Sequence, residues 1–529
     1  MNTPRFFNTA GPVRCDEHYC LPPLKRFNLD DVLSLIDQKK YFVLHAPRQS
    51  GKTSSLQALM DYLNHEGKYN CLYFNVELGQ SAREDVMQGI QAILSEMALM
   101  AEDFLADPFP ESIWASVLEK SGGHAAFNKV LTHWAEKSPK PLVLLIDEID
   151  ALVGDTLISV LRQLRAGYAK RPARFPQSII LCGVRDVRDY RIHSEQEKAI
   201  ITGGSAFNVK AESLRLGNFN QADVETLYAQ HTFDTGQKFE PDALNLVWEL
   251  TQGQPWLVNA LGYEVCFKIK AHRNRSVSIT TKMLEQAKEN LILRRETHLD
   301  QLMDKLKEAR VQRVIQPILL GEKTPLSPED IEYVIDLGLV HRYQNGRLEI
   351  ANRIYQEVIP RELAWGFQMS MVEETVWYVD AHSGKLDMEK LLAAFQSFFR
   401  ENSEHWLQQF QYHEAGPQLL LQAFLQRILN SGGRVEREYG LGRMRTDLLV
   451  IWPLSEGTQK VVIELKLVYV SRQSTITQGL QQTWQYMDKA GTAEGHLLIF
   501  DRDINHAWAD KIFREEQSYQ NQTIIVWGM

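Results

Sequence analysis

Eight consecutive residues have the types that bind the phosphates of a nucleotide: Ala46-Pro47-Arg48-Gln49-Ser50-Gly51-Lys52-Thr53. Such a site needs a tight turn whose backbone N–H groups point at phosphate oxygens, a lysine for the β- and γ-phosphates, and a hydroxyl for Mg²⁺. Gly51, Lys52 and Thr53 supply these groups, and Ala46 stands where the common motif has its first glycine without removing a donor. The predicted binding residues are Ala46, Ser50, Gly51, Lys52, Thr53 and Ser54.

An acidic pair further along the chain suits the same chemistry. Asp147 and Glu148 follow the apolar run PLVLLI. Asp147 would hold Mg²⁺ through water, and Glu148 would polarise the attacking water. The first motif is also compatible with a chance GKT in a turn, and the second with two acidic residues that cap a strand. Because both occur in the expected order on predicted strands, we predict binding of ATP or GTP, with ATP and Mg²⁺ as the expected cofactors.

A second group of charged residues lies near the C-terminus. Asp447 opens the strand-like run TDLLVIW, and Glu464 and Lys466 lie within KVVIELKLVYV. Because side chains alternate between the faces of a strand, Glu464 and Lys466 point the same way. The two carboxylates can bind Mg²⁺, and Lys466 can orient a water or stabilise a leaving charge, which is the chemistry of phosphodiester cleavage. The alternative is an exposed cross-strand ion pair at a sheet edge.

Short apolar runs position the first site. They are rich in β-branched residues, helix-like segments separate them, and they cover residues 41–46, 71–76, 141–147 and 178–184. This alternation predicts an α/β fold with a parallel sheet covered by helices on both faces.

The rest of the chain changes character several times. We expect a multidomain protein divided into 1–208 (ATPase core with an N-terminal segment), 209–295 (helical lid), 296–365 (winged helix), 366–408 (helical linker) and 409–529 (a separate α/β domain). In the winged helix, Ser327 and Pro328 predict a helix start, and Asn345-Gly346 predicts a two-residue hairpin.

Residues 14–290 resemble the AAA+/STAND group of P-loop ATPases, with the phosphate loop as Walker A and Asp147-Glu148 as Walker B. The run IILCGVR, ending in Arg185, looks like the sensor strand of that group, and GQP at 253–255 looks like the motif of its helical lid. The resemblance implies that Arg185 reads the γ-phosphate and that Pro255 lies near the adenine. A plain β-turn is an equally good interpretation of GQP.

Residues 409–503 resemble the PD-(D/E)xK nuclease superfamily, which implies a restriction-endonuclease-like αβββαβ domain. Asp447, Glu464 and Lys466 match its signature, although Thr446 stands where the motif has its proline. The resemblance implies a metal-dependent nuclease that uses Mg²⁺, with Mn²⁺ as an alternative ion.

Further residues of this domain match the superfamily less closely. Glu414 stands just before the expected first helix, where an additional acidic metal ligand is often found. Gln482 and Tyr486 resemble the QxxxY motif of the RecB-like branch, and their i, i+4 spacing places them on one helix face. The resemblance implies that Gln482 reaches the metal site and Tyr486 the phosphate.

Basic residues near both C-terminal regions offer phosphate contacts. Those around the nuclease-like strands are Arg434, Arg437, Arg443, Arg445 and Arg472, and those of the winged helix are Lys305, Lys307, Arg310 and Arg313. A solvated face is as good an interpretation for each residue singly. The winged helix has two equally weighted roles, duplex binding and part of a switch.

Composition limits the class of protein. The net charge of −9 excludes a protein that coats nucleic acid with its whole surface. No apolar run is long enough for a membrane span, and the N-terminus has no secretory signal. We expect reduced thiols and a cytoplasmic location, because the cysteines show no paired spacing; they are Cys15, Cys20, Cys71, Cys182 and Cys266.

These observations lead to three functional hypotheses. The preferred one is an ATPase that gates a Mg²⁺-dependent nuclease acting on DNA rather than RNA, in defence or mobile-element biology. The second is a nucleotide-dependent scaffold or regulatory switch whose C-terminal domain only binds nucleic acid or a partner. The third is a DNA loader or translocase. A homo-oligomer is left open, and no membrane partner is expected.

Overall fold

The computed structural model divides the chain into two compact units. One comprises Met1–His298 and Ile331–Arg347, and the other comprises Leu299–Asp330 and Leu348–Met529. The structure describes residues 4–186, 191–194, 199–202, 206–294, 299, 302, 304–320, 326–343, 346–359, 378–380, 383–409, 421–422, 424–425, 434–441, 444–454, 457–468, 471–501, 503 and 506–529.

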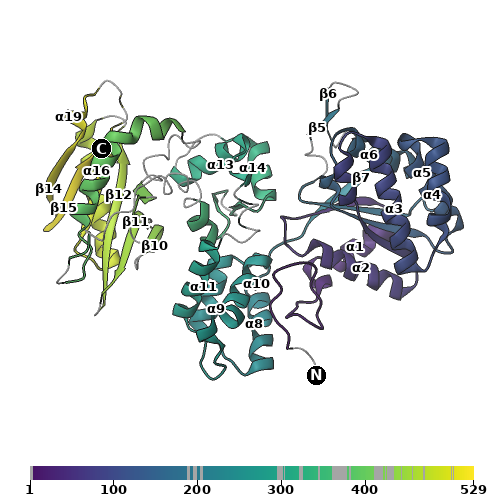
Figure 1. Cartoon of the computed structure of the whole chain (residues 1–529), viewed down its shortest axis with the longest axis horizontal. Coiled ribbons are helices and arrows are strands. Elements are labelled where there is room, and N and C mark those ends of the chain that lie inside the picture. Colours follow the sequence, from purple (N-terminus) through teal and green to yellow (C-terminus); the bar gives the residue numbers. More distant parts are fainter. Residues whose placement is uncertain are drawn as a thin grey trace. The chain divides into compact units, whose positions relative to one another are not determined.

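A parallel five-stranded sheet forms the centre of the first unit (Figure 1). Its strands are β1 (Tyr41–His45), β2 (Asn70–Asn75), β3 (Leu142–Asp147), β4 (Ser178–Gly183) and β7 (Lys210–Arg215). They lie in the order β2-β3-β4-β1-β7, and every neighbouring pair is parallel. The predicted α/β fold with a parallel sheet is therefore confirmed for this unit.

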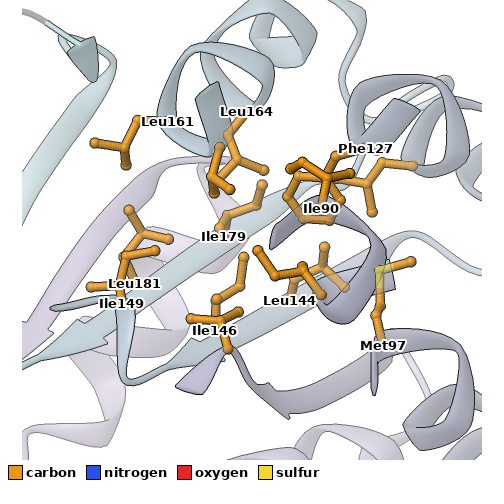
Figure 2. Packing of buried hydrophobic residues seen from close by; sticks show 14 of the residues in the cluster. Ile90, Met97, Phe127, Leu144, Ile146, Ile149, Leu161, Leu164, Ile179 and Leu181 are labelled. Atoms are coloured by element: carbon orange, nitrogen blue, oxygen red, sulfur yellow. The ribbon is translucent and has the colours of Figure 1, made fainter. Parts of the chain in front are cut away.

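Helices cover both faces of this sheet, because alternate strand residues are apolar on each side. On one face, α3 (Val86–Leu105), α5 (Gly123–Lys137) and α6 (Gly154–Gly167) pack against Leu144 and Ile179 (Figure 2). On the other face, α1 (Leu29–Asp37) and α2 (Lys52–Glu66) pack against residues of opposite parity, such as Leu145 and Ile180. Helix α4 (Phe109–Ser121) packs against α3 and α5. The carboxyl ends of the strands are thus held rigidly.

Strand β7 is an element that the sequence did not predict. It pairs with β1 along the edge of the sheet, beyond residue 208, where we expected the helical lid to begin. Its sequence KAESLR is polar and its residues are mostly half-buried or exposed, so it lacks the apolar run of the other strands. A separate pair of antiparallel strands, β5 (Arg191–Ser194) and β6 (Ala199–Thr202), precedes it.

Four helices follow β7. They are α8 (Gln221–Thr235), α9 (Pro241–Thr251), α10 (Pro255–Tyr263) and α11 (Thr281–Leu293), with a π-helical turn at Glu264–Lys268 after α10. Short 3-10 helices lie at Pro23–Arg26, Glu77–Ala82, Ile149–Ala151, Tyr168–Lys170 and Lys270–Arg273. Helix α8 begins with a capping box, in which the side chains of Asn220 and Asp223 each bond the other's backbone N–H.

Residues 299–350 contain α13 (Ala309–Leu320), α14 (Pro328–Asp336), β8 (Val340–Arg342) and β9 (Leu348–Ile350). Helix α14 begins at Pro328, where Ser327 and Pro328 predict a helix start. The division between the two units passes through this region, and Asn345 lies outside the described residues. The winged helix and the five-part division of the chain stay predictions.

A six-stranded mixed sheet forms the centre of the second unit (Figure 1). Its strands are β10 (Arg434–Leu441), β11 (Met444–Pro453), β12 (Thr458–Leu467), β13 (Gly495–Phe500), β14 (Phe513–Tyr519) and β15 (Gln522–Gly528), in the order β10-β11-β12-β13-β15-β14. The first three are antiparallel, and β12, β13 and β15 are parallel. The helices are α16 (Met388–Gln409), α18 (Arg472–Ala490) and the short α19 (Trp508–Lys511).

The expected order of three strands, a helix and a fourth strand is present as β10, β11, β12, α18 and β13. The sheet also contains β14 and β15, which lie beyond residue 503, where the expected core ends. The nuclease-like fold itself stays a prediction.

The cysteines differ in part from the expectation. Cys15 and Cys20 form a disulfide bond with their Cα atoms 5.1 Å apart, whereas we expected only reduced thiols. Their four-residue spacing resembles no common paired motif, which is why the sequence did not reveal the pair. Cys71, Cys182 and Cys266 are free and buried. None of the helices in the described part of the chain combines the length and apolar character that a membrane span requires.

Candidate functional site

The phosphate loop connects β1 to α2 and ends at a helix N-terminus. Gly51 caps α2 in the left-handed region, with φ of 89°, a conformation that costs a glycine little. Lys52 and Thr53 are the first two helical residues. The backbone N–H groups of a first helical turn have no partner within the helix, so the loop presents them to an anion.

The lysine of the loop is held by neutral groups. Lys52 is 5% exposed, and its Nζ donates to Ala46 O at 2.9 Å and to Pro47 O at 3.1 Å. Ser50 Oγ also donates to Pro47 O, at 2.7 Å. The cation therefore lies inside the loop and is positioned by carbonyl oxygens.

The acidic pair lies beside the hydroxyl of the loop. Thr53 Oγ1 donates to Asp147 Oδ2 at 2.8 Å, and Tyr73 donates from its hydroxyl to the same oxygen at 3.1 Å. Asp147 is fully buried at the end of β3. A threonine hydroxyl next to a carboxylate is an oxygen donor set of the kind that Mg²⁺ prefers, so these two residues fit the expected ion.

Glu148 follows in the left-handed region, with φ of 55°, which is uncommon for a residue with a side chain. Burial raises the pKa of its carboxyl, and the charge of Asp147 raises it further, while Lys52 lowers it. A carboxylate with a raised pKa is a better proton acceptor near neutral pH. The backbone thus turns Glu148 away from the strand and into an environment suited to a general base.

The C-terminal turn of α14 packs against the carboxyl edge of the first sheet. Arg185, two residues beyond β4, stacks its guanidinium over the ring of Tyr333, 4.7 Å from the centroid. A Cβ added to Gly338 would lie 2.8 Å from Pro47 Cγ, so this turn touches the phosphate loop. The residue expected to read the γ-phosphate is therefore in contact with α14.

His45, the last residue of β1, lies 3.7 Å from the carboxylate of Asp336 through its Nδ1. Burial lowers the pKa of His45 to about 4. The imidazole is neutral at neutral pH, so the contact is not an ion pair there.

A cavity of about 140 Å³ adjoins the phosphate loop. Three segments line it: residues 8–26 near the N-terminus, the loop with the first turn of α2, and residues of α8 and α10, including Pro255. Pro255 begins α10 next to Trp256, whose Nε1 donates to Thr9 O at 3.0 Å. Ser54 also lines the cavity, and its hydroxyl accepts from Val13 N at 2.9 Å.

Sequence reasoning missed the N-terminal wall of this cavity. Its lining residues include Asn8, Thr9, Gly11 and Arg26. None of them belongs to a recurring motif, and only the fold brings the N-terminal segment to the phosphate loop.

The second candidate site lies inside the second sheet. Lys466 Nζ donates to Glu464 Oε1 at 2.6 Å, and Glu464 is 2% exposed. Strand β12 lies between β11 and β13. The pair therefore does not lie at a sheet edge, and Glu464 is buried whereas Lys466 is partly exposed.

The strand register places the backbone of residue 447 near that of Glu464. Leu448 pairs with Ile463 at the end of the antiparallel ladder, so Asp447 and Glu464 each stand one residue beyond that pair. The side chain of Asp447 lies outside the described residues. Val462, of the same parity as Glu464, packs against α18, so the face concerned is the one that α18 covers.

Helix α18 carries two of the three remaining expected residues. Gln482 Oε1 is buried and has no hydrogen-bond partner among the described atoms, and Tyr486 is 6% exposed in the core under the helix. Glu414 lies outside the described residues. Among the side chains that the structure describes, no group of three acidic, histidine or cysteine residues is arranged to hold a metal ion.

The basic residues expected to contact phosphates have acidic partners where they are described. Arg472 pairs with Glu515 at 3.0 Å and stacks on Phe513. The ion pairs near α13 are Lys305–Glu308, Lys307–Asp304, Arg310–Asp330 and Arg313–Asp330. Side chains of Arg434, Arg437, Arg443 and Arg445 lie outside the described residues.

The first site defines a class of protein. A phosphate loop after β1, an acidic pair after β3 and a strand between them that leads to an arginine form the nucleotide-binding site of a P-loop ATPase-like protein. The profile of the AAA-like domain family matches residues 31–359, which is more than half of the chain, so the chain belongs to this family.

Solved structures resemble the chain weakly. The Walker-type ATPase of Pyrococcus abyssi is 14% identical, with a TM-score of 0.42, and the match covers 67% of this chain and 99% of that one. Cdc6p of Pyrobaculum aerophilum is 14% identical, with a TM-score of 0.35 and coverage of 64% and 93%. A variant of RuvB from Thermotoga maritima is 12% identical, with a TM-score of 0.32 and coverage of 62% and 90%. No curated protein matches the chain significantly.

Proposed function

We propose that the protein hydrolyses ATP and uses its nucleotide state to control a Mg²⁺-dependent nuclease that acts on DNA. The observation that supports the nuclease is the contact between the buried Glu464 and the partly exposed Lys466 on an interior strand. Withdrawing a carboxylate from water costs several kcal/mol unless it is well paired, so a functional role is a reason for its presence.

At the first site the residues divide the work of hydrolysis. Lys52 and the first turn of α2 bind the phosphates, and Thr53 and Asp147 hold Mg²⁺, which neutralises phosphate charge when bound. Glu148 accepts the proton of the attacking water, and its raised pKa suits this role.

At the second site Asp447 and Glu464 supply oxygen ligands to a divalent ion, which provides a water of lowered pKa and neutralises charge on the phosphodiester. Lys466 orients that water or stabilises the leaving charge. The buried Oε1 of Gln482 on α18, which has no partner among the described atoms, is a further acceptor in this proposal. Glu414 is a further acidic ligand in this proposal.

Control by nucleotide requires that ATP binds one conformation better than the other. Arg185 contacts the ring of Tyr333, and in this proposal it contacts the γ-phosphate when ATP is bound. In this proposal binding of ATP draws Arg185 from α14 to the nucleotide, and the released turn of α14 passes the change to the chain that follows it.

The test is cleavage of plasmid DNA with Mg²⁺ or Mn²⁺, with and without ATP. Wild type is expected to cleave, and Asp447→Asn and Lys466→Ala are expected to lose cleavage while their ATP turnover stays normal. Lys460→Ala is the matched control, because Lys460 is an exposed lysine at the other end of β12. Cleavage that persists in Lys466→Ala would refute the assigned site.

A second candidate function is a nucleotide-dependent switch whose C-terminal domain binds nucleic acid or a partner without cleaving it. The mutual pairing of Glu464 and Lys466 favours it, because an ion pair of this kind is already neutralised. It predicts DNA binding with no cleavage under any divalent ion.

A further inference from the structure

Arg26 lies at the junction of the cavity and the phosphate loop. It ends the 3-10 helix Pro23–Arg26 and lines the cavity. Its Nη1 donates to Ser50 O at 3.0 Å, and its Nη2 donates to Gly217 O at 2.5 Å. A Cβ added to Gly51 would lie 3.2 Å from Nη1, so the guanidinium is in direct contact with the loop.

Two carbonyl oxygens and an aromatic ring hold this guanidinium in place. It stacks on Phe219 at 4.6 Å, and Arg26 forms no ion pair with a carboxylate in the part of the chain that the structure describes. Burial lowers its pKa to about 10, against a raising influence of Asp223. The carboxylate of Asp223 accepts from Asn220 N at 3.0 Å in the cap of α8. Among the described residues, Arg26 is thus a partly buried cation whose hydrogen bonds go to neutral carbonyls and not to a carboxylate.

We propose that Arg26 binds the α-phosphate of the nucleotide, an assignment that rests on the proposed binding of ATP at the loop. A guanidinium has five N–H donors, and Arg26 uses two groups for carbonyls, which leaves donors for phosphate oxygens. The incoming phosphate supplies the missing negative charge.

The position of Arg26 between two subsites selects the α-phosphate. A cavity of about 140 Å³ is similar in size to cavities that take up an aromatic ring, so it suits the base. The loop and Lys52 take the β- and γ-phosphates. The α-phosphate joins these two parts of a nucleotide, and Arg26 touches both the cavity and Gly51.

The test compares the affinities of Arg26→Met for adenosine, AMP, ADP and ATP, measured by calorimetry on the full-length chain. The three phosphorylated ligands are expected to bind about 10- to 100-fold more weakly than to wild type, as expected for loss of a charged hydrogen bond. Adenosine, which has no phosphate, is expected to bind unchanged. The matched control is Lys25→Met, which removes a positive charge from the exposed neighbour that does not line the cavity.

A thermal unfolding curve separates ligand binding from a structural role. Arg26→Met is expected to keep its unfolding temperature without nucleotide and to lose most of the increase that ATP produces. A structural role would lower the unfolding temperature without nucleotide and weaken adenosine as much as ATP, which would overturn the proposal. If Arg26→Met does not fold, Arg26→Lys takes its place, with a smaller loss of about 3- to 10-fold for the same three ligands.

The control variant Lys52→Ala distinguishes failure of this proposal from failure of nucleotide binding. If wild type binds ATP, Lys52→Ala does not, and Arg26→Met binds normally, only the role of Arg26 is refuted. If wild type binds no nucleotide, the proposed ATP site fails and the role of Arg26 fails with it.

Discussion

The two candidate sites use the same kinds of residue in opposite ways. At the phosphate loop, Lys52 donates to the neutral carbonyls of Ala46 and Pro47, and its charge acts on Glu148 without a hydrogen bond between them. In the second sheet, Lys466 donates directly to Glu464. The first arrangement is ready for an anion, whereas the second is neutral until a ligand separates its charges. The two lysines therefore have different chemistry, because Lys52 contacts neutral carbonyls whereas Lys466 contacts a carboxylate.

The largest expected effect is on nucleotide binding at the phosphate loop. Lys52→Ala removes the cation that contacts the phosphates, and we expect ATP affinity to fall by about two orders of magnitude, as for loss of a strong charge-assisted hydrogen bond. Fluorescent-nucleotide titration measures it, and Lys129→Ala, an exposed lysine on α5, is the control. Unchanged affinity in Lys52→Ala would mean that the loop does not bind phosphate.

The second effect concerns the contribution of the Glu464–Lys466 pair to the free energy of unfolding. Lys466→Ala leaves the buried carboxylate of Glu464 without this cation, and we expect a loss of about 2 kcal/mol of unfolding free energy, less than for a fully buried pair because Lys466 is partly exposed. Denaturant unfolding measures it. The double variant Glu464→Met with Lys466→Met is expected to recover most of the loss. A single variant as stable as wild type would show that the pair contributes nothing to the fold.

The third effect is a pH dependence confined to the phosphate site. Because the pKa of Glu148 is raised, ATP turnover is expected to fall about tenfold per pH unit as the pH drops below that pKa, at a higher pH than for an ordinary glutamate. Below that pH the carboxyl is protonated and cannot accept the proton of water. Initial rates of ATP turnover between pH 4.5 and 8 measure this decrease at low pH. Glu148→Gln should turn over ATP slowly and should not show the decrease.

The same shift has the opposite sign for stability. A carboxyl whose pKa is raised on folding stabilises the folded state at low pH, and this stabilisation is lost as the pH rises through the folded pKa. The stability of Glu148→Gln relative to wild type is therefore expected to increase as the pH rises through the pKa of Glu148. A stability difference that does not change with pH would contradict a raised pKa of Glu148.

The smallest expected effect tests the contact between Arg185 and α14. Tyr333→Leu removes a cation–π contact of about 0.5–1 kcal/mol, so ATP affinity is expected to rise about two- to fivefold if Arg185 must leave Tyr333 to reach the nucleotide. Tyr343→Leu, which alters an exposed tyrosine in the same segment, is the control. A lower ATP affinity in Tyr333→Leu would show that the contact supports binding.

Most of the first site was predictable from sequence because its residues are contiguous and its strands are apolar throughout. The runs that became β1 to β4 are buried on both faces, which leaves a clear pattern. Strand β7 escaped notice because KAESLR is an edge strand with polar residues. The contact of Arg26 with Ser50 and Gly217 was not predictable, since it depends on segments far apart in the sequence.

In the second unit, alternation along β12 correctly predicted that Glu464 and Lys466 share a face. It could not predict that β12 is an interior strand, because the sequence does not reveal which strands are neighbours. Strands β14 and β15 lie outside the pattern of the resembling family, so the family gave no guide to them.

The close approach of Gly338 to Pro47 has a consequence for any molecule that acts on residues 331–347. If the loop holds the triphosphate as proposed, moving this turn is expected to change the affinity for ATP. Thermodynamic linkage makes the effect reciprocal. A partner that binds this segment with higher affinity when ATP is present must raise the affinity for ATP by the same factor. Binding of ATP and binding of this partner would therefore each change the affinity for the other through the turn at Gly338.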